Sequence, residues 1–147
     1  MSTFTTRIAE EIMASYPEWK PMAAYETYKG SEPYLVVTVP APIEADARIP
    51  LRISTWDDEI TVDFDYYHSH FDRWHPEAGD TSNESARLYV EALLSEQLAV
   101  ASWWQGELCK VCAQHERGAA LKVPFAVSYT RVRVRSWNGA LNEDRDA

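Results

Sequence analysis

The sequence predicts an α+β fold in which two helices accompany a mainly antiparallel, twisted sheet, in the order α-ββββ-α-βββ. Three observations carry this prediction: helical spacing of apolar residues near 4–15 and 82–96, short alternating segments, and tight turn signals between successive segments. Short connections favour antiparallel pairing, because a parallel pair needs a long crossover. A length of 147 residues, 46% of them hydrophobic, predicts one domain over residues 1–147.

The first part of the chain is expected to form one helix and two strands. The helix spans residues 4–15, and the pair Tyr16-Pro17 ends it because the residue before a proline disfavours helical geometry. Alternating apolar residues predict strands over 22–29 and 34–39. The turn signal Gly30-Ser31-Glu32-Pro33 separates these strands.

A hairpin over residues 48–67 is the clearest local prediction. Its apolar side chains fall on odd positions in the first strand and on even positions in the second. A tight turn at Asp57-Asp58 then places Ile53 opposite Val62, so that both apolar faces point the same way.

The remaining elements follow from turn and capping signals. We expect a polar loop over 68–80, followed by a helix over 82–96 that a capping box of Thr81 and Glu84 opens. Residues 98–104 fit a further helical turn or a strand, and we favour a strand, joined by a turn at Gln105-Gly106-Glu107 to a second strand up to residue 113. A loop over 116–124, a strand over 126–137 and a frayed tail over 138–147 complete the chain.

Acidic residues outnumber basic ones by 23 to 14, which gives a formal net charge of −9. This balance argues against binding to nucleic acid or to anionic membranes, since both are polyanions. It favours a basic partner, or it simply serves solubility. Residues 57–72 alone carry −6, because they hold six acidic residues and no Lys or Arg. Residues 107–135, by contrast, carry +4.

Two accounts of the acidic segment stay open. In the first, the charges are paired internally: the hairpin register puts Arg52 opposite Asp63, and the row Arg131, Arg133, Arg135 lies beside the acidic strand if the two are neighbours. In the second, the segment is a surface that binds a basic protein, with flanking aromatic residues as anchors. The predicted partner-binding residues are Trp56, Asp57, Asp58, Glu59, Asp63, Asp65, Tyr67 and Trp74. For Trp56, Tyr67 and Trp74 the competing interpretation is packing in the core or at a sheet edge.

An alternative function is metal binding or metal-dependent catalysis by a histidine cluster. Two histidines at alternate positions of a strand project to one face, which is a geometry used for zinc or iron. The competing interpretation is that His68 and His70 continue the inward side of the strand after Tyr66. The residues of this alternative site are His68, His70, His75 and Asp72.

The sequence contains no high-specificity catalytic motif, so we expect a protein that is not an enzyme and needs no cofactor. The pair Cys109 and Cys112 matches a redox or zinc spacing. Within a strand, however, these thiols are expected to point to opposite faces. No secretory signal or apolar run of membrane-spanning length is present, which favours a cytoplasmic protein. A homo-oligomer with its aromatic residues at a self-interface is a third possibility.

Two segments carry a resemblance to a known group of proteins. Residues 54–71 (STWDDEITVDFDYYHSHF) and 134–139 (VRSWNG) resemble segments of small bacterial proteins. Some of those are similar to immunity proteins encoded beside polymorphic or contact-delivered toxins. The resemblance implies a small, acidic, cytoplasmic α+β protein that binds and blocks one cognate toxin domain and is not an enzyme. Because such families are diverse, it implies no individual binding residues.

Overall fold

The computed structural model describes all 147 residues. The chain is an α+β protein with two α-helices, three short 3-10 helices and nine strands in two antiparallel sheets. The elements are α1 (Thr3–Ser15), η1 (Pro17–Met22), β1 (Ala23–Glu26), β2 (Tyr34–Val39), η2 (Ile43–Ala45), β3 (Leu51–Ser54), η3 (Trp56–Asp58), β4 (Ile60–Phe64), β5 (Tyr67–Phe71), α2 (Ala86–Leu94), β6 (Leu98–Gln105), β7 (Leu108–Glu116), β8 (Arg131–Arg135) and β9 (Glu143–Asp146).

The chain forms two compact units whose segments alternate along the sequence. Unit 1 comprises Met1–Pro40, Pro50–Asp63 and His68–Val90, and unit 2 comprises Ala41–Ile49, Phe64–Tyr67 and Glu91–Ala147. Neither unit is a continuous stretch of chain. The single domain expected from the length stays a prediction.

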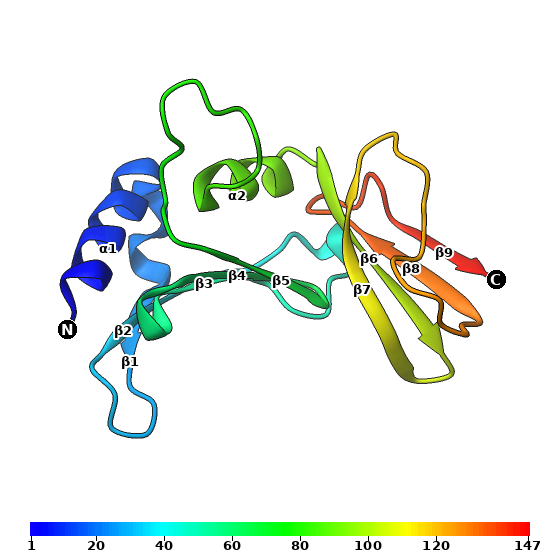
Figure 1. Cartoon of the computed structure of the whole chain (residues 1–147), viewed down its shortest axis with the longest axis horizontal. Coiled ribbons are helices and arrows are strands. Elements are labelled where there is room, and N and C mark those ends of the chain that lie inside the picture. Colours follow the sequence, from blue (N-terminus) through cyan, green and yellow to red (C-terminus); the bar gives the residue numbers. More distant parts are fainter. The chain divides into compact units, whose positions relative to one another are not determined.

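The sheet of unit 1 has the strand order β1-β2-β3-β4-β5, and α1 lies against one of its faces (Figure 1). Ser2 caps this helix by accepting a hydrogen bond from the Thr5 amide at 3.1 Å, and the helix ends at Tyr16 as expected. Ile8 and Ile12 are fully buried, together with alternate residues of the strands. The opposite face of the sheet carries polar and aromatic side chains, among them Tyr34, Arg52, Asp63, His68 and His70, and is called the open face below.

The predicted hairpin is confirmed in its register. Ile53 pairs with Val62, and Arg52 pairs with Asp63. The connection is wider than a two-residue turn, because the last pair of the ladder is Ser54 with Thr61. The 3-10 helix η3 lies within this connection, where Asp57 and Asp58 both have positive φ.

The sheet of unit 2 has the order β7-β6-β8-β9 (Figure 1). One face packs a small apolar core of Ala99, Ala101, Trp103, Val132 and Val134. The helix α2 begins later than expected, at Ala86. Its first turn is capped by Ser85, whose hydroxyl accepts from the Leu88 amide at 3.4 Å, and the predicted box of Thr81 and Glu84 does not form.

The sequence analysis did not predict two of the strands. It also predicted one sheet, whereas the structure has two. The strand β5 falls in the expected polar loop, because only Phe71 of its five residues is buried. The strand β9 falls in the expected frayed tail. All four of its residues are charged, and it pairs along β8 so that Arg131 faces Asp146 and Arg133 faces Asp144. Charged side chains are typical of a sheet edge.

Candidate partner-binding site

The loop that joins β3 to β4 displays one aromatic and two acidic side chains. Trp56 is 45% exposed, and Asp57 and Asp58 are exposed beside it. Their φ values of 59° and 52° lie in the left-handed region, which Asp enters more readily than most residues. Asp58 accepts a hydrogen bond from the Ser2 hydroxyl at 2.7 Å, which orients this carboxylate without neutralising it.

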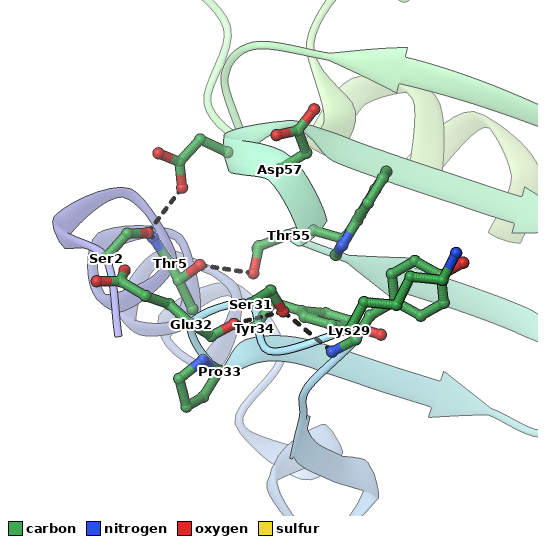
Figure 2. A pocket seen from close by; sticks show the side chains of 12 residues that line it. Ser2, Thr5, Lys29, Ser31, Glu32, Pro33, Tyr34, Thr55 and Asp57 are labelled. Carbon is green, nitrogen blue, oxygen red and sulfur yellow. Dashed lines mark hydrogen bonds between the residues drawn. The ribbon is translucent and has the colours of Figure 1, made fainter.

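A hollow of about 430 Å³ lies between this loop and the turn that joins β1 to β2 (Figure 2). Its aromatic lining comes from Tyr28, Tyr34 and Trp56. The Tyr28 and Trp56 rings meet edge to face, with their centroids 5.9 Å apart. Three carboxylates and one ammonium group also line it, from Glu32, Asp57, Asp58 and Lys29.

Two threonines fix the position of the loop beneath the hollow. The hydroxyls of Thr5 and Thr55 are 2.9 Å apart, and Thr55 Oγ1 also accepts from the Leu35 amide at 2.9 Å. The Thr55 amide in turn donates to the Leu35 carbonyl at 3.1 Å. Because Thr5 and Thr55 are buried, these bonds tie the loop to α1 and β2 and hold Trp56 in place.

The open face of the unit 1 sheet adjoins this hollow. A second depression, of about 450 Å³, shares Tyr28, Tyr34 and Trp56 with the first. On this face Arg52 lies 3.8 Å from both the Glu26 and the Asp63 carboxylates. The expected pairing of Arg52 with Asp63 is therefore confirmed, and Asp63 is partly neutralised within the chain.

The pair His68 and His70 lies on the open face, with ring centroids 5.0 Å apart. The expectation that both continue the inward side of the preceding strand is wrong, since both are exposed. A turn at Asp65, with φ of 54°, separates β4 from β5 and resets the alternation of side chains. The Nδ1 atom of His70 is 3.1 Å from the Glu59 carboxylate and 3.0 Å from the Thr61 hydroxyl.

The alternative metal site does not assemble. No group of three or more His, Cys, Asp or Glu side chains is arranged to hold a metal ion. His75 Nδ1 lies 3.2 Å from an Arg87 nitrogen. Asp72 pairs with Arg73, and the hydrogen bond and charge of that guanidinium lower the pKa of the Asp72 carboxyl. His68 and His70 are thus the only two of the four that the structure shows in mutual contact.

Two of the predicted partner-binding residues are buried, which corrects their assignment. Asp65 is 1% exposed, and its carboxylate accepts from Arg133 at 2.6 Å and from the Arg48 amide at 2.7 Å. Trp74 is 0% exposed, and its indole nitrogen donates to the Ser15 hydroxyl at 3.0 Å. Both side chains therefore stabilise the fold and are shielded from a binding partner. Tyr67 is half-buried at the start of β5.

Two arginines of β8 form ion pairs within unit 2. Arg133 pairs with Asp65 and stacks over the Tyr66 ring, 5.3 Å from its centroid. Arg135 pairs with Asp46 and Asp144 at 3.1 and 3.0 Å. Internal pairing of the acidic segment is therefore confirmed for Asp65 and Asp63. It does not extend to Asp57 and Asp58, which have no ion pair.

The two cysteines lie on one face of β7, which corrects the expectation of opposite faces. A β-bulge between Trp103 and Trp104 pairs Cys109 with Trp104 and Cys112 with Ser102. The extra residue, Lys110, shifts the alternation by one position. Both thiols are free and half-buried, and burial raises the pKa of each.

The sequence did not single out Tyr28 and Tyr34, although they line the hollow. The available signal was their position on either side of the turn Gly30-Ser31-Glu32-Pro33, which brings two aromatic residues within one tight connection. Their proximity to Trp56 depends on the pairing of β2 with β3.

Comparisons with protein-family models, with curated proteins and with solved structures found no match to this chain. None of its helices has both the length and the apolar composition needed to cross a membrane. Its two α-helices comprise 13 and 9 residues.

Proposed function

We propose that this protein is an immunity-type inhibitor, which binds a basic bacterial toxin domain in the cytoplasm and neutralises it. The observation that carries this proposal is the loop at Trp56, where a half-exposed indole stands beside Asp57 and Asp58. Both residues have left-handed backbone conformations, and neither carboxylate has an ion pair within the chain. The loop thus presents an aromatic anchor and uncompensated negative charge at one place.

Burial and ion pairing remove three residues from the predicted partner-binding surface. Asp65 and Trp74 are buried, and Asp63 is paired with Arg52. Of the predicted residues, Trp56, Asp57 and Asp58 are exposed, and Glu59 and Tyr67 are half-buried. The structure adds Tyr28 and Tyr34, which line the hollow together with Trp56, Asp57 and Asp58.

The two kinds of side chain have different roles in such a complex. Exposed carboxylates raise the rate of encounter with a basic partner and lose this effect as salt screens them. An aromatic anchor that becomes buried slows dissociation, because most of the binding energy of an interface comes from a few such residues. Trp56 is the best-placed anchor, since its neighbours Tyr28 and Thr55 already limit its motion.

The test of this function is protection of growing cells. The genes beside the one that encodes this chain are inspected for a toxin-like C-terminal domain, and that domain is produced from an inducible promoter. Cells that also produce this protein are expected to grow, and cells without it to stop. A genome neighbourhood without any toxin domain, or growth arrest despite abundant soluble protein, would contradict the proposal.

The acidic loop is tested by removing its charge without changing its shape. The substitutions Asp57→Asn and Asp58→Asn keep a residue that tolerates positive φ. We expect association with the toxin domain to slow about tenfold at low salt, and the difference to shrink at high salt. The matched control is Glu10→Gln with Glu18→Gln, which removes the same charge from exposed positions of α1 and η1.

A further inference from the structure

We propose that the hollow between Trp56 and the β1–β2 turn receives one arginine side chain of the basic partner. This inference rests on the proposed function and specifies what its central contact is. The hollow has a volume of about 430 Å³, within the range of sites that hold a compact ligand group. Its walls are aromatic and its rim is acidic, which is the chemistry that recognises an organic cation.

The aromatic walls are positioned to bind a cation. The Tyr28 and Trp56 rings stand nearly perpendicular, at 86°, and Tyr34 lines the same hollow. The face of an aromatic ring attracts a cation through its quadrupole. The chain itself shows this attraction here, because Lys29 Nζ lies 5.2 Å from the centroid of the Tyr28 ring.

The charge of the hollow favours a cation over a neutral or anionic group. Glu32, Asp57 and Asp58 contribute three negative charges, and Lys29 contributes one positive charge, which leaves a formal −2. Asp57 has no ion pair in the chain, and Asp58 is bonded only to the neutral Ser2 hydroxyl. Figure 2 shows Asp57, Glu32 and Lys29 around the same hollow.

The combination of groups favours a guanidinium over an ammonium ion. A guanidinium group is planar, so it can lie on an aromatic ring while its edge donates to a carboxylate with two parallel hydrogen bonds. Trp56 and Asp57 are adjacent in the sequence and both line the hollow, so they offer these two surfaces to the same ligand. An ammonium ion is more strongly hydrated and gains less from the ring.

The test uses the full chain and Nα-acetyl-arginine methylamide as the probe. Binding is followed by NMR through the Trp56 indole N–H signal, assigned with the Trp56→Leu variant. We expect saturable shifts of this signal at millimolar probe. The corresponding lysine derivative should bind more weakly, and the neutral citrulline derivative should not shift the signal. Equal shifts from the citrulline derivative, or no shift from the arginine derivative, would overturn the proposal.

Substitutions locate the site. Asp57→Asn should weaken binding of the arginine probe about fivefold, and Trp56→Leu, followed through the Ser31 amide, should weaken it by at least as much. Lys29→Gln should strengthen binding, because it removes the internal cation from the Tyr28 ring. Tyr25→Leu and Glu10→Gln, which alter exposed residues outside the hollow, are the controls and should leave it unchanged.

The failure of this inference is distinguishable from failure of the proposed function. If the arginine probe does not bind while the chain still protects cells from the toxin domain, the inhibitor uses another contact. If the probe binds as expected but no neighbouring toxin exists, the cation site stands and the inhibitor function falls.

Discussion

Arg133 donates a hydrogen bond of 2.6 Å to the carboxylate of Asp65, whose side chain is completely shielded from solvent. The other carboxylate oxygen accepts from the Arg48 amide at 2.7 Å. Both residues belong to unit 2, where the pair joins the turn at Asp65 to β8. It also removes one charge from the acidic segment that the sequence predicts to bind a partner.

Loss of Arg133 should destabilise the protein strongly. Arg133→Met leaves the Asp65 carboxylate buried without a cation, which costs about 3–5 kcal/mol. Urea unfolding followed by tryptophan fluorescence measures this loss. The control is Arg131→Met on the same strand, where the guanidinium lies 5.1 Å from the Trp104 ring and the residue is half-exposed, so that about 0.5–1 kcal/mol is lost.

A second substitution separates the charge from the packing. Adding Asp65→Asn to Arg133→Met removes the buried charge, and Asn tolerates the positive φ at this position. We expect the double variant to recover much of the stability. If the two losses simply add, the pair is not coupled and the assignment of its role is wrong.

Glu96 should make the stability of the fold depend on pH. Burial raises the pKa of this carboxyl, but hydrogen bonds from the Ser136 hydroxyl, the Ala140 amide and Asn138 outweigh burial and lower the pKa below its ordinary value. The ionised form is therefore favoured in the folded state. Its contribution is present above the unfolded-state pKa and is lost as pH falls through the lower folded-state value.

The variant Glu96→Gln tests this dependence. At pH 7 it should lose about 1.5–3 kcal/mol, the contribution of hydrogen bonds to a charged group. The difference from the unchanged chain should shrink as the pH is lowered below the ordinary range of a Glu carboxyl. Unfolding curves from pH 3 to pH 7 give the comparison, and a difference that stays constant with pH would contradict the prediction.

Gly139 should not tolerate a side chain. Its φ is +81°, and a Cβ atom there would overlap the backbone carbonyl oxygen of Glu44. Gly139→Ala therefore combines left-handed strain of about 1–2 kcal/mol with overpacking of about 1–3 kcal/mol. Gly118→Ala is the matched control, since Gly118 has φ of +80° with open space around it and pays the strain alone. Equal melting temperatures of the two variants would contradict this account.

Substitutions of the two predicted anchor tryptophans, Trp74 and Trp56, should differ in their effect on stability. Trp74→Ala should cost about 3–5 kcal/mol, because the indole is fully buried and bonded to Ser15. Trp56→Ala should stay within about 1 kcal/mol, because nearly half of this side chain is exposed. Thermal unfolding measures both. A large loss at Trp56 would show that its role is structural.

Local patterns were sufficient for much of the unit 1 sheet. The register of Ile53 with Val62 follows from the period of two and from burial of one face, because a slip by one residue would expose every apolar side chain. The strands β5 and β9 could not be found this way. β5 lies at a sheet edge beside β4, and β9 lies at a sheet edge beside β8. Their own residues are mostly polar, so neither shows the apolar alternation that predicts a strand.

Acidic residues of the segment 57–72 have different surroundings in the structure, although their local sequences are similar. Asp57, Asp58 and Asp65 look alike in the sequence, and each has positive φ in the structure. Two of them lie exposed in a loop, whereas Asp65 meets Arg133, 68 residues further along the chain. A local charge count cannot tell these cases apart.

The sequence by itself determined the α+β class, the first helix, the central hairpin and the concentration of negative charge, because periodicity and composition act over a few neighbouring residues. Only the tertiary structure decided which charges are free, which tryptophan is exposed, and that Tyr28, Tyr34 and Trp56 surround one hollow. The physical reason is that burial, ion pairing and cavity shape depend on contacts between residues far apart in the chain, which a local pattern does not encode.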